Sequence, residues 1–345
     1  MKNFAVCLAL IILLACQSAI SQTSSTGSTN RIQNRQETGF SVVTVGTGNP
    51  DYNPERGSAC TMIKYNGNYI LVDMGNGTQA RLREGGVRLP RISTLMFTHH
   101  HLDHSEEFIP IFIYSRLRGG SRNVITPKGT RNYVDFALDF YREYIEYRIG
   151  WDGLHNKDEY YDYNVREVEH GDKFEVDGLT VTAAEVQHTI YTLAYRFQAD
   201  EKSIVVSGDL VYSENLVELA KDADVLVMDG YPVRSRRTVR KNVNPDSAAQ
   251  RSAGNQQQRT QRVRVETQTV DLDTIPIWKR TRAQIRSHGS LEEMARMAGE
   301  AGVKKLVFTH LGRNNVDEEG TLEVVRNFFQ GEVIFAVDLM EIFPD

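Results

Sequence analysis

The chain has 345 residues, of which 40% are hydrophobic and 25% are charged, and its formal net charge is −5. This length allows one large domain or two small ones with a substantial core, and the composition is ordinary for a soluble globular protein. The mild charge excludes a general attraction to nucleic acid or to anionic membranes.

The first 21 residues are typical of an export signal. Lys2 is followed by an apolar run over 4–15, about 12 residues long, which suits a signal peptide and is short for a membrane-spanning helix. Residues 19–21 favour cleavage near residue 22, whereas residues 13–16 resemble a lipobox that would make Cys16 a lipidated first residue. Both alternatives predict an exported protein, either periplasmic, secreted or an outer-membrane lipoprotein. A membrane contact is expected only through that lipid.

Cysteine usage fits export without requiring a disulfide. Cys7 and Cys16 lie in the export segment, so the mature chain keeps Cys60, with Cys16 added if it is lipidated. An oxidising compartment is therefore tolerated, but no internal disulfide is available. Residues 22–39 are rich in Ser, Thr, Gln and Asn, which predicts a flexible linker before the folded domain of residues 40–345.

From Phe40 onward, segments with strand and helix patterns are mixed, which predicts an α+β fold. The predicted strands are 41–45, 61–65, 69–73, 94–98, 179–186, 194–198, 203–207, 225–228, 306–309, 333–336 and 339–342. The predicted helices are 104–117, 132–148 and 291–301, the last with Ser290 as its N-cap.

Two stretches of this domain have an unusual composition. Residues 133–163 carry many tyrosines with Phe136, Phe140 and Trp151, and we interpret them as a helix that packs its aromatic face into the core. The alternative is an aromatic wall of a substrate pocket. Residues 231–286 hold 13 basic and 4 acidic residues, a net charge of +9. We interpret residues 234–286 as a long surface insertion; the alternative is a basic flap that attracts an anionic substrate.

The strongest chemical signal is a cluster of ligand-type residues directly after the predicted strand 94–98. His99, His101 and Asp103 alternate along an extended segment, so their side chains can converge, and His104 begins the following helix. Imidazole nitrogen and carboxylate oxygen both suit zinc, and four such residues within six positions predict a metal site. His100 is expected to point away from the metal, and His155 and His170 are expected in loops or turns, where the sequence suggests no partner for them.

This cluster resembles the H-x-H-x-D-H signature of metallo-β-lactamase-fold hydrolases. Further elements of that family's pattern follow in order, each at the end of a predicted strand: Asp73, His188, Asp209 and His310. Each short match is weak, but the ordered set is strong. The resemblance implies an αββα four-layer sandwich, with two mixed β-sheets flanked by helices.

The resemblance also implies the metal ligands. One zinc would take His99, His101, His188 and Asp209, and a second would take Asp103, His104, Asp209 and His310. Two Zn²⁺ ions with a bridging water supply hydroxide at neutral pH, in a site to which Asp103 contributes catalytically. His101 stands where the redox di-iron branch usually has Glu, which favours a zinc hydrolase.

Further segments are similar to the tRNase Z and arylsulfatase-like branch, namely 46–50, 73–78 and 288–290. In that branch a histidine before the last helix protonates the leaving group, and His288 occupies its place. Asp229 stands where tRNase Z has a Glu that orients this histidine, and a carboxylate-oriented imidazole is a sensible general acid. The Gly- and Pro-rich tRNA-gripping arm is not apparent in the sequence, and an export signal argues against tRNA maturation.

Four interpretations of the function follow. The first is an exported hydrolase of small anionic phosphodiester or sulfate esters, and the second is a β-lactamase or lactonase. The third is a tRNase Z-like ribonuclease whose basic insertion holds RNA, and the fourth is a non-enzymatic metal-binding module, in which Asp103→Ala would leave function intact. The ligands do not name the substrate, and the sequence leaves open whether the chain forms a homo-oligomer.

Overall fold

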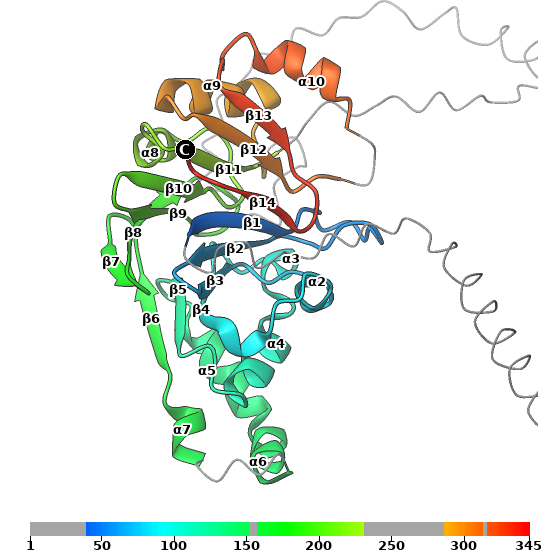
Figure 1. The fold of residues 1–345 in the computed structure, drawn as a ribbon, viewed down its shortest axis with the longest axis vertical. Helices are drawn as coiled ribbons and strands as arrows, with labels where there is room; N and C mark the ends of the chain where they lie inside the picture. The colour runs from blue at the N-terminus through cyan, green and yellow to red at the C-terminus, as the bar shows by residue number, and fades with distance from the viewer. Residues whose placement is uncertain (1–38, 152–156, 231–285, 313–315) are drawn as a thin grey trace, which may run out of the picture.

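The computed structural model describes residues 39–151, 157–230, 286–312 and 316–345 (Figure 1). The predicted export segment, residues 22–38 of the predicted linker, His155 and residues 234–285 of the predicted insertion lie outside the described residues. Within the described part of the chain, no helix is both long and apolar enough to span a membrane.

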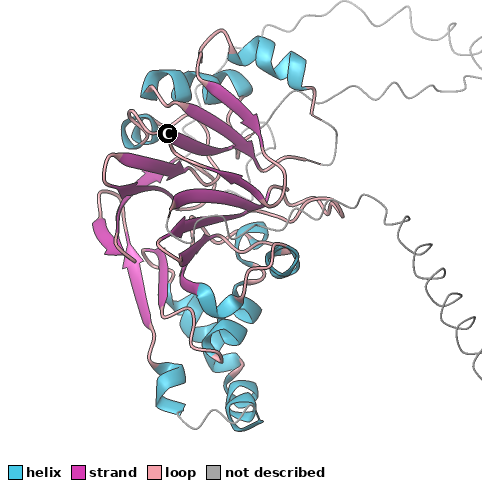
Figure 2. Ribbon diagram, in the orientation of Figure 1, coloured by secondary structure: helices cyan, strands magenta, loops and turns pink. Residues whose placement is uncertain are grey.

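Two seven-stranded sheets form the centre of the domain (Figure 2). The first sheet has the order β14 (Met340–Ile342), β1 (Phe40–Gly46), β2 (Cys60–Tyr65), β3 (Asn68–Val72), β4 (Ile92–Met96), β5 (Asn123–Pro127) and β6 (Asn164–Val168). The second has the order β13 (Glu332–Phe335), β12 (Lys305–Thr309), β11 (Val225–Asp229), β10 (Lys202–Val206), β9 (Thr192–Ala199), β8 (Leu179–Val186) and β7 (Lys173–Val176). Each sheet is mixed, since strands β3 to β6 and β10 to β13 pair in parallel and the other neighbours are antiparallel.

Three apolar clusters bury the faces of these sheets. One lies between the sheets and includes Val42, Val72 and Phe197. The second lies under the helices on the first sheet, which are α2 (Thr78–Glu84), α4 (Phe108–Arg116), α5 (Arg131–Phe140), α6 (Arg142–Trp151) and α7 (Lys157–Tyr161). The third lies under α8 (Glu214–Leu219), α9 (Leu291–Ala301) and α10 (Glu318–Val325) on the second sheet. The predicted four-layer sandwich with two mixed sheets is therefore confirmed.

The segment predicted as one helix over 104–117 is two helices, α3 (Leu102–Ser105) and α4. The loop after β3 inserts its backbone at the break, because the amide of Met74 donates to the carbonyl of His104 at 2.7 Å and the amide of Glu107 donates to the carbonyl of Met74 at 2.8 Å. Gly75 is required for this approach, since a Cβ there would lie 2.0 Å from the carbonyl oxygen of Asp103. These backbone hydrogen bonds hold the loop that carries Asp73 against the histidine cluster.

The prediction for the aromatic segment was wrong for its outer rings. The single helix expected over 132–148 is divided into α5 and α6. Tyr133 packs against the core, but Phe136, Phe140 and Trp151 are 70%, 70% and 74% exposed. None of these rings lines a cavity described below, so the structure does not favour the pocket-wall alternative either.

A buried hydrogen bond connects the two sheets just before the histidine cluster. The hydroxyl of Tyr195, on β9, donates to the carbonyl of Phe97 at 2.7 Å, and both residues are fully buried. We expect Tyr195→Phe to lower the free energy of unfolding by about 1–2 kcal/mol, because the carbonyl oxygen of Phe97 would remain buried after losing its hydrogen-bond donor. Urea denaturation of the metal-free protein measures this. Tyr147→Phe, which is exposed, should change the free energy by less than about 0.5 kcal/mol.

Candidate metal centre

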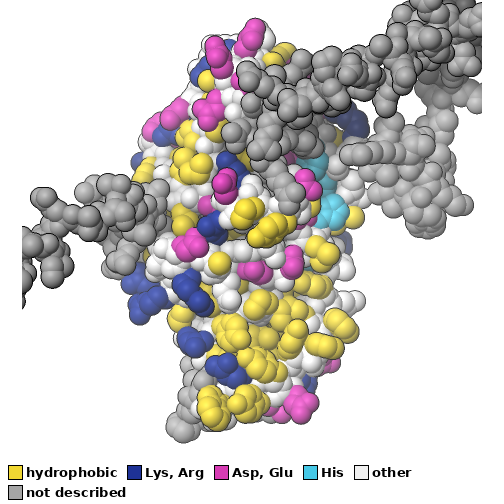
Figure 3. Space-filling model, turned by 90° about the vertical axis from the view of Figure 1, so that its right-hand side faces the viewer, with side chains coloured by type: hydrophobic (Ala, Val, Ile, Leu, Met, Phe, Trp, Pro, Cys, Tyr) yellow, Lys and Arg dark blue, Asp and Glu magenta, His cyan; other side chains and the backbone are white. Residues whose placement is uncertain are grey.

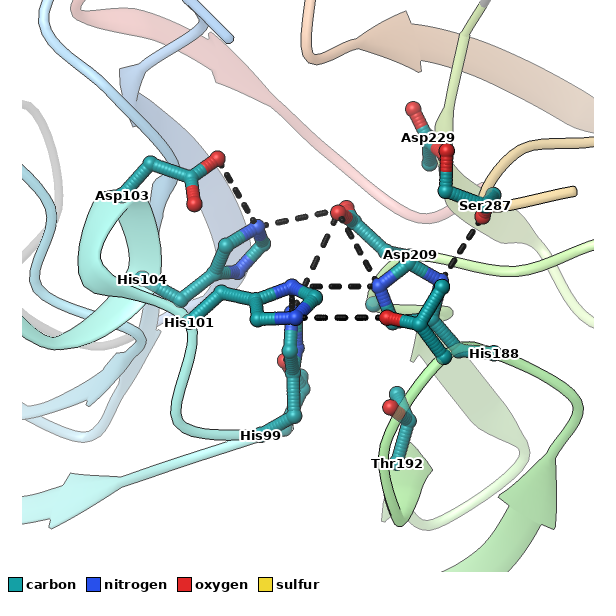
Figure 4. Close-up of polar contacts among 12 residues, drawn as sticks. His99, His101, Asp103, His104, His188, Thr192, Asp209, Asp229 and Ser287 are labelled. Atoms are coloured by element: carbon teal, nitrogen blue, oxygen red, sulfur yellow. Dashed lines mark hydrogen bonds and ion pairs between the residues drawn. The ribbon is translucent and has the colours of Figure 1, made fainter. Parts of the chain in front are cut away.

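The histidine cluster follows β4 and ends in α3. His99 is fully buried and precedes His101, which has extended backbone angles (φ −66°, ψ 150°) as the N-cap of α3. Because α3 begins at Leu102, its first turn brings the side chains of Asp103 and His104 toward those of His99 and His101. Figure 4 shows these side chains facing His188 and Asp209 from the other sheet.

The first predicted ligand set converges in the structure. Nε2 of His99 lies 3.0 Å from Nδ1 of His101, and Nε2 of His188 lies 3.2 Å from the same atom. Oδ2 of Asp209 lies 3.9 Å from Nε2 of His99 and 3.7 Å from Nε2 of His188. One ligand atom from each of the four residues falls within 4.8 Å of the others, which a single ion can join.

The second predicted set converges beside the first. Nε2 of His310 lies 3.1 Å from Oδ2 of Asp103 and 3.5 Å from Oδ1 of Asp209, and Nε2 of His104 lies 3.2 Å from the same oxygen of Asp209. The two carboxylate oxygens of Asp209 therefore face different ligand sets, as a residue that bridges two ions must.

Backbone geometry places the two residues that follow strands β3 and β12. Asp73 and His310 both have left-handed angles, with φ of 61° and 59°. Left-handed angles are uncommon outside glycine, and Asp and His are among the residues that adopt them most readily. Gly208, which precedes Asp209, packs against Thr98, and a Cβ there would lie 2.8 Å from the Cβ of Thr98. The bridging carboxylate is thus held close to the end of β4.

Hydrogen bonds fix the tautomers of three ligands. Asp73 accepts from Nδ1 of His104 at 2.8 Å and from the hydroxyl of Thr98 at 2.7 Å. The Thr98 oxygen lies 3.0 Å from Nδ1 of His99, and the carbonyl of Ser287 lies 2.7 Å from Nδ1 of His188. Each Nδ1 then carries its proton toward an acceptor, so Nε2 is left to coordinate a metal.

Unpartnered buried atoms show that the site fits cations. Nε2 of His104 and Oδ1 of Asp209 are buried without a hydrogen-bond partner. Burial opposes ionisation of Asp209, but the charges of His310 and His104 hold its pKa well below the usual range. Burial likewise lowers the pKa of His188, to about 4, so this ring is neutral at pH 7 and has a lone pair to offer. Nitrogen and carboxylate ligands of this kind suit zinc.

A second pair of residues stands next to the ligands. Nδ1 of His288 lies 2.5 Å from Oδ2 of Asp229, whose other oxygen lies 3.4 Å from Nδ1 of His310. Burial alone would lower the pKa of His288, but the hydrogen bond and charge of Asp229 raise it above its ordinary value. Burial and the charge of Asp209 raise the pKa of Asp229. The pair therefore retains a proton close to the metal ligands.

Two further histidines in the described part of the chain, His100 and His170, do not contribute to the ligand sets. Nε2 of His100 lies 2.9 Å from the hydroxyl of Thr126, which confirms that its ring points away from the ligands. His170 lies in a turn, as predicted, and its Nδ1 accepts from the amide of Glu185 at 3.2 Å, which ties this turn to β8.

Sequence reasoning missed three residues that support the ligands. Thr98 and Ser287 hold His99 and His188, and the hydroxyl of Thr189 lies 3.2 Å from Nε2 of His101. Thr98 could have been noticed as a polar residue closing an apolar strand. A main-chain carbonyl such as that of Ser287 leaves no sequence signal, because every residue has one.

Three cavities adjoin the ligands. A small one of about 30 Å³ is lined by His104, Asp209, Asp229 and His310 and has room for a water molecule. One of about 760 Å³ opens beside His188, lined by Thr189, Tyr191, Tyr212, Glu185 and Glu214 among others. One of about 400 Å³ opens beside Asp103, and Tyr52, Asn53, Arg56, Asn76 and Glu106 contribute to its wall. Substrate can thus extend from the metal ligands in two directions.

Residues 68–311 match the family model described as the beta-lactamase superfamily domain. The chain belongs to this superfamily. Among curated proteins, it is 29% identical over 276 residues to ribonuclease Z of Mycolicibacterium paratuberculosis, which covers 78% of this chain and 85% of the relative.

Solved structures of the superfamily share the fold at lower identity. The metallo-beta-lactamase fold protein YhfI from Bacillus subtilis has a TM-score of 0.59 and 16% identity, covering 88% of this chain and 99% of its own. The short form of human tRNase Z has a TM-score of 0.57 and 18% identity, with the same coverage. A diphosphatase of the PhnP family has a TM-score of 0.56 and 15% identity, covering 89% of this chain and 98% of its own. These likenesses show that the fold is shared.

We expect Asp73→Asn to lower metal affinity by roughly 10–100-fold, because Asp73 orients His104 without itself being a ligand. Asparagine tolerates the left-handed backbone of this position, so the fold is retained and the effect reports the hydrogen bond. Titration against a competing zinc chelator measures the affinity. Asp177→Asn is the matched control, since Asp177 also has a positive φ, of 52°, and bonds Ser93 away from the ligands. Equal losses in the two variants would contradict the role of Asp73.

Proposed function

We propose that this protein is an exported two-zinc hydrolase of small phosphodiester or sulfate esters, with phosphodiesters as the first expectation. The observation that carries the proposal is the contact between His288 and Asp229 beside the ligand atoms. His99, His101, His188 and Asp209 would hold one zinc, and Asp103, His104, Asp209 and His310 the other. When bound, such a pair activates water and neutralises charge on the ester oxygens.

His288 supplies the proton that the departing group needs. Asp229 engages Nδ1, so Nε2 carries the proton toward substrate, and the Asp229 carboxylate raises the pKa of the ring, which favours its protonated form. An alkoxide leaves an ester readily only if it is protonated as the bond breaks, which is what a positioned imidazolium does. Asp229 is a positioning residue here, since it acts through the ring.

This arrangement favours acyclic phosphate and sulfate esters over lactams and lactones. One of the two larger cavities is lined by His188, from the first ligand set, and the other by Asp103, from the second set. An ester with a substituent on each side of its central atom would fill both. Relatives named ribonuclease Z and a neighbour titled a diphosphatase cleave phosphate bonds by name, which supports the same class.

A ribonuclease Z-like activity is the second candidate, favoured by the names of the curated relatives. RNA binding requires basic side chains that replace phosphate counterions. Among the described residues that line the two larger cavities, Arg56 is the one Lys or Arg, and its guanidinium already donates to Thr47 and to the carbonyl of Ala336. The described walls therefore favour a small ester over RNA.

A substrate panel tests the proposal. Zinc-loaded protein is assayed with bis-p-nitrophenyl phosphate, an aryl sulfate, nitrocefin, an acyl-homoserine lactone and a tRNA precursor. We expect turnover of the phosphodiester, with Asp209→Asn as the inactive control. Hydrolysis of nitrocefin or of the lactone alone would overturn the proposal, and cleavage restricted to the tRNA precursor would establish the second candidate instead.

Export is a separate part of the proposal, and it rests on the sequence of residues 1–21. Fractionation of cells that express the full chain should place the protein outside the cytoplasm. Cys16→Ser distinguishes the two processing alternatives, because it abolishes lipid labelling and membrane association only if Cys16 is the lipidated residue. Retention of the unprocessed chain in the cytoplasm would contradict export.

A further inference from the structure

His101 turns a different ring nitrogen toward the first ligand set than the other two histidines of that set do. Its Nδ1 lies 3.0 Å from Nε2 of His99 and 3.2 Å from Nε2 of His188. Figure 4 shows the rings of His101 and His188 facing each other. An ion held between the three rings would therefore be bound by Nδ1 of His101 and by Nε2 of the other two.

The positions of the ring protons follow from this arrangement. A histidine that binds a metal is neutral, so it offers a lone pair on one nitrogen and carries a proton on the other. For His99 and His188 the protonated atom is Nδ1, which faces the hydroxyl of Thr98 and the carbonyl of Ser287. For His101 the protonated atom must be Nε2, and that proton needs an acceptor on the far side of the ring.

Thr189 lies where this acceptor is needed. Its hydroxyl oxygen is 3.2 Å from Nε2 of His101, and a hydroxyl oxygen accepts a hydrogen bond without giving up its own proton. Partners of this kind set the tautomer and the orientation of a ligating imidazole. Because Thr189 directly follows His188, one residue binds the first ion and the next residue holds a ligand that comes from the other sheet.

The loop between β8 and β9 fixes the position of Thr189. Before this residue, the carbonyl of Gln187 accepts from the amide of Val211 at 2.9 Å. After it, the amide of Leu193 donates to the carbonyl of Thr98 at 2.9 Å, which ties the loop to the end of β4. The loop is therefore bonded on both sides of Thr189, so its hydroxyl is held beside the ligands by the backbone.

We propose that Thr189 is a positioning residue of the metal centre, whose hydroxyl accepts from Nε2 of His101 and thereby selects Nδ1 as the metal-binding atom. Half a turn of the imidazole about its bond to Cβ would put a carbon where Nδ1 lies, and the first ligand set would lose one nitrogen. The hydroxyl opposes that turn, because the turned ring would present a C–H to it. This inference rests on the two-zinc centre of the proposed function and not on the substrate.

Titration of the zinc-loaded full chain with a zinc chelator tests the proposal. Figure 3 shows histidine side chains at the surface of the molecule, and Thr189 lines the larger cavity, so a chelator in solution can compete for the first ion. Thr189→Val keeps the shape and removes the acceptor. It should raise the dissociation constant of one zinc roughly 10-fold. The constant of the other zinc should change much less, because His101 is absent from the second ligand set.

Nitrogen-15 spectra of the zinc-loaded chain, labelled at histidine, give a readout that a general loss of stability would not produce. The wild type should show a ligand ring with a metal-bound Nδ1 and a protonated Nε2, and His101→Gln should remove its signals and so assign them. In Thr189→Val this pattern should weaken or broaden, because the ring exchanges between its two orientations.

Two variants serve as controls. Thr189→Ser keeps the hydroxyl and should restore both the zinc affinity and the spectrum. Thr192→Val makes the same change in the same loop, where the hydroxyl donates to the carbonyl of Ile190 at 2.9 Å, and it should leave both zinc constants unchanged. Wild-type affinity and spectrum in Thr189→Val, or an equal loss in Thr192→Val, would overturn the proposal. A wild type that binds no zinc would instead refute the two-zinc centre itself.

Discussion

Replacing Asp209 with asparagine should lower kcat/KM for a phosphodiester by at least roughly 10³-fold, because the change removes several kcal/mol of stabilisation from both ligand sets at once. Its two oxygens face different sets, at 3.2 Å from His104 and 3.7 Å from His188. Asparagine keeps the shape but offers one neutral oxygen. We therefore expect plasma mass spectrometry to find less than the full metal content of the wild type.

The control for this variant is Asp200→Asn, an acid-to-amide change in an exposed turn with a positive φ of 51°. It should leave both metal content and kcat/KM within about twofold of the wild type. If Asp209→Asn kept full metal content and near-normal activity, Asp209 would not bridge two ions and the proposed centre would be wrong.

The second large effect concerns the proton donor. His288→Gln should lower kcat by roughly 10²–10⁴-fold for a diester with an alkoxide leaving group, and much less for bis-p-nitrophenyl phosphate. The reason is that p-nitrophenolate leaves without protonation. Paired kcat measurements on the two substrates at equal zinc content separate this role from a structural one, which would lower both rates equally.

The pH dependence gives an independent check on the same pair. Asp229 raises the pKa of His288, so the acid form persists to a higher pH than an unpaired imidazole would allow. The rate with a poor leaving group should fall as pH rises through this raised value. Asp229→Asn removes the charge, so the alkaline limb of the profile should move to lower pH. An unchanged alkaline limb would show that another group donates the proton.

Much of the metal centre was predictable because its residues occupy strand ends. Asp73, Asp209 and His310 each follow a short apolar strand, and in the structure parallel strands bring these ends to one edge of each sheet. The sequence also places His288 directly before the capping box of Ser290 and Glu293, which fixes where α9 begins. Local sequence patterns thus predicted where the candidate ligands lie along the chain, and the family resemblance predicted which of them share an ion.

Other features depend on contacts that no local pattern encodes. The break between α3 and α4 results from a backbone insertion by Met74, a residue about thirty positions upstream. The carbonyl of Ser287 holds His188 from 99 positions away. Phe136 and Trp151 were expected on a helix face that packs into the core, but the buried faces are formed by Leu138 on α5 and by Ile149 on α6.

The ligands come from both halves of the sandwich, with His99, His101, Asp103 and His104 following the first sheet and His188, Asp209 and His310 following the second. Ions bound between the two halves would link them, so the free energy of unfolding should increase with the free zinc concentration. At one hundred times the dissociation constant the gain is about 2.7 kcal/mol. If the protein is exported as proposed, zinc supply outside the cytoplasm would then govern its lifetime against proteolysis as well as its catalytic rate.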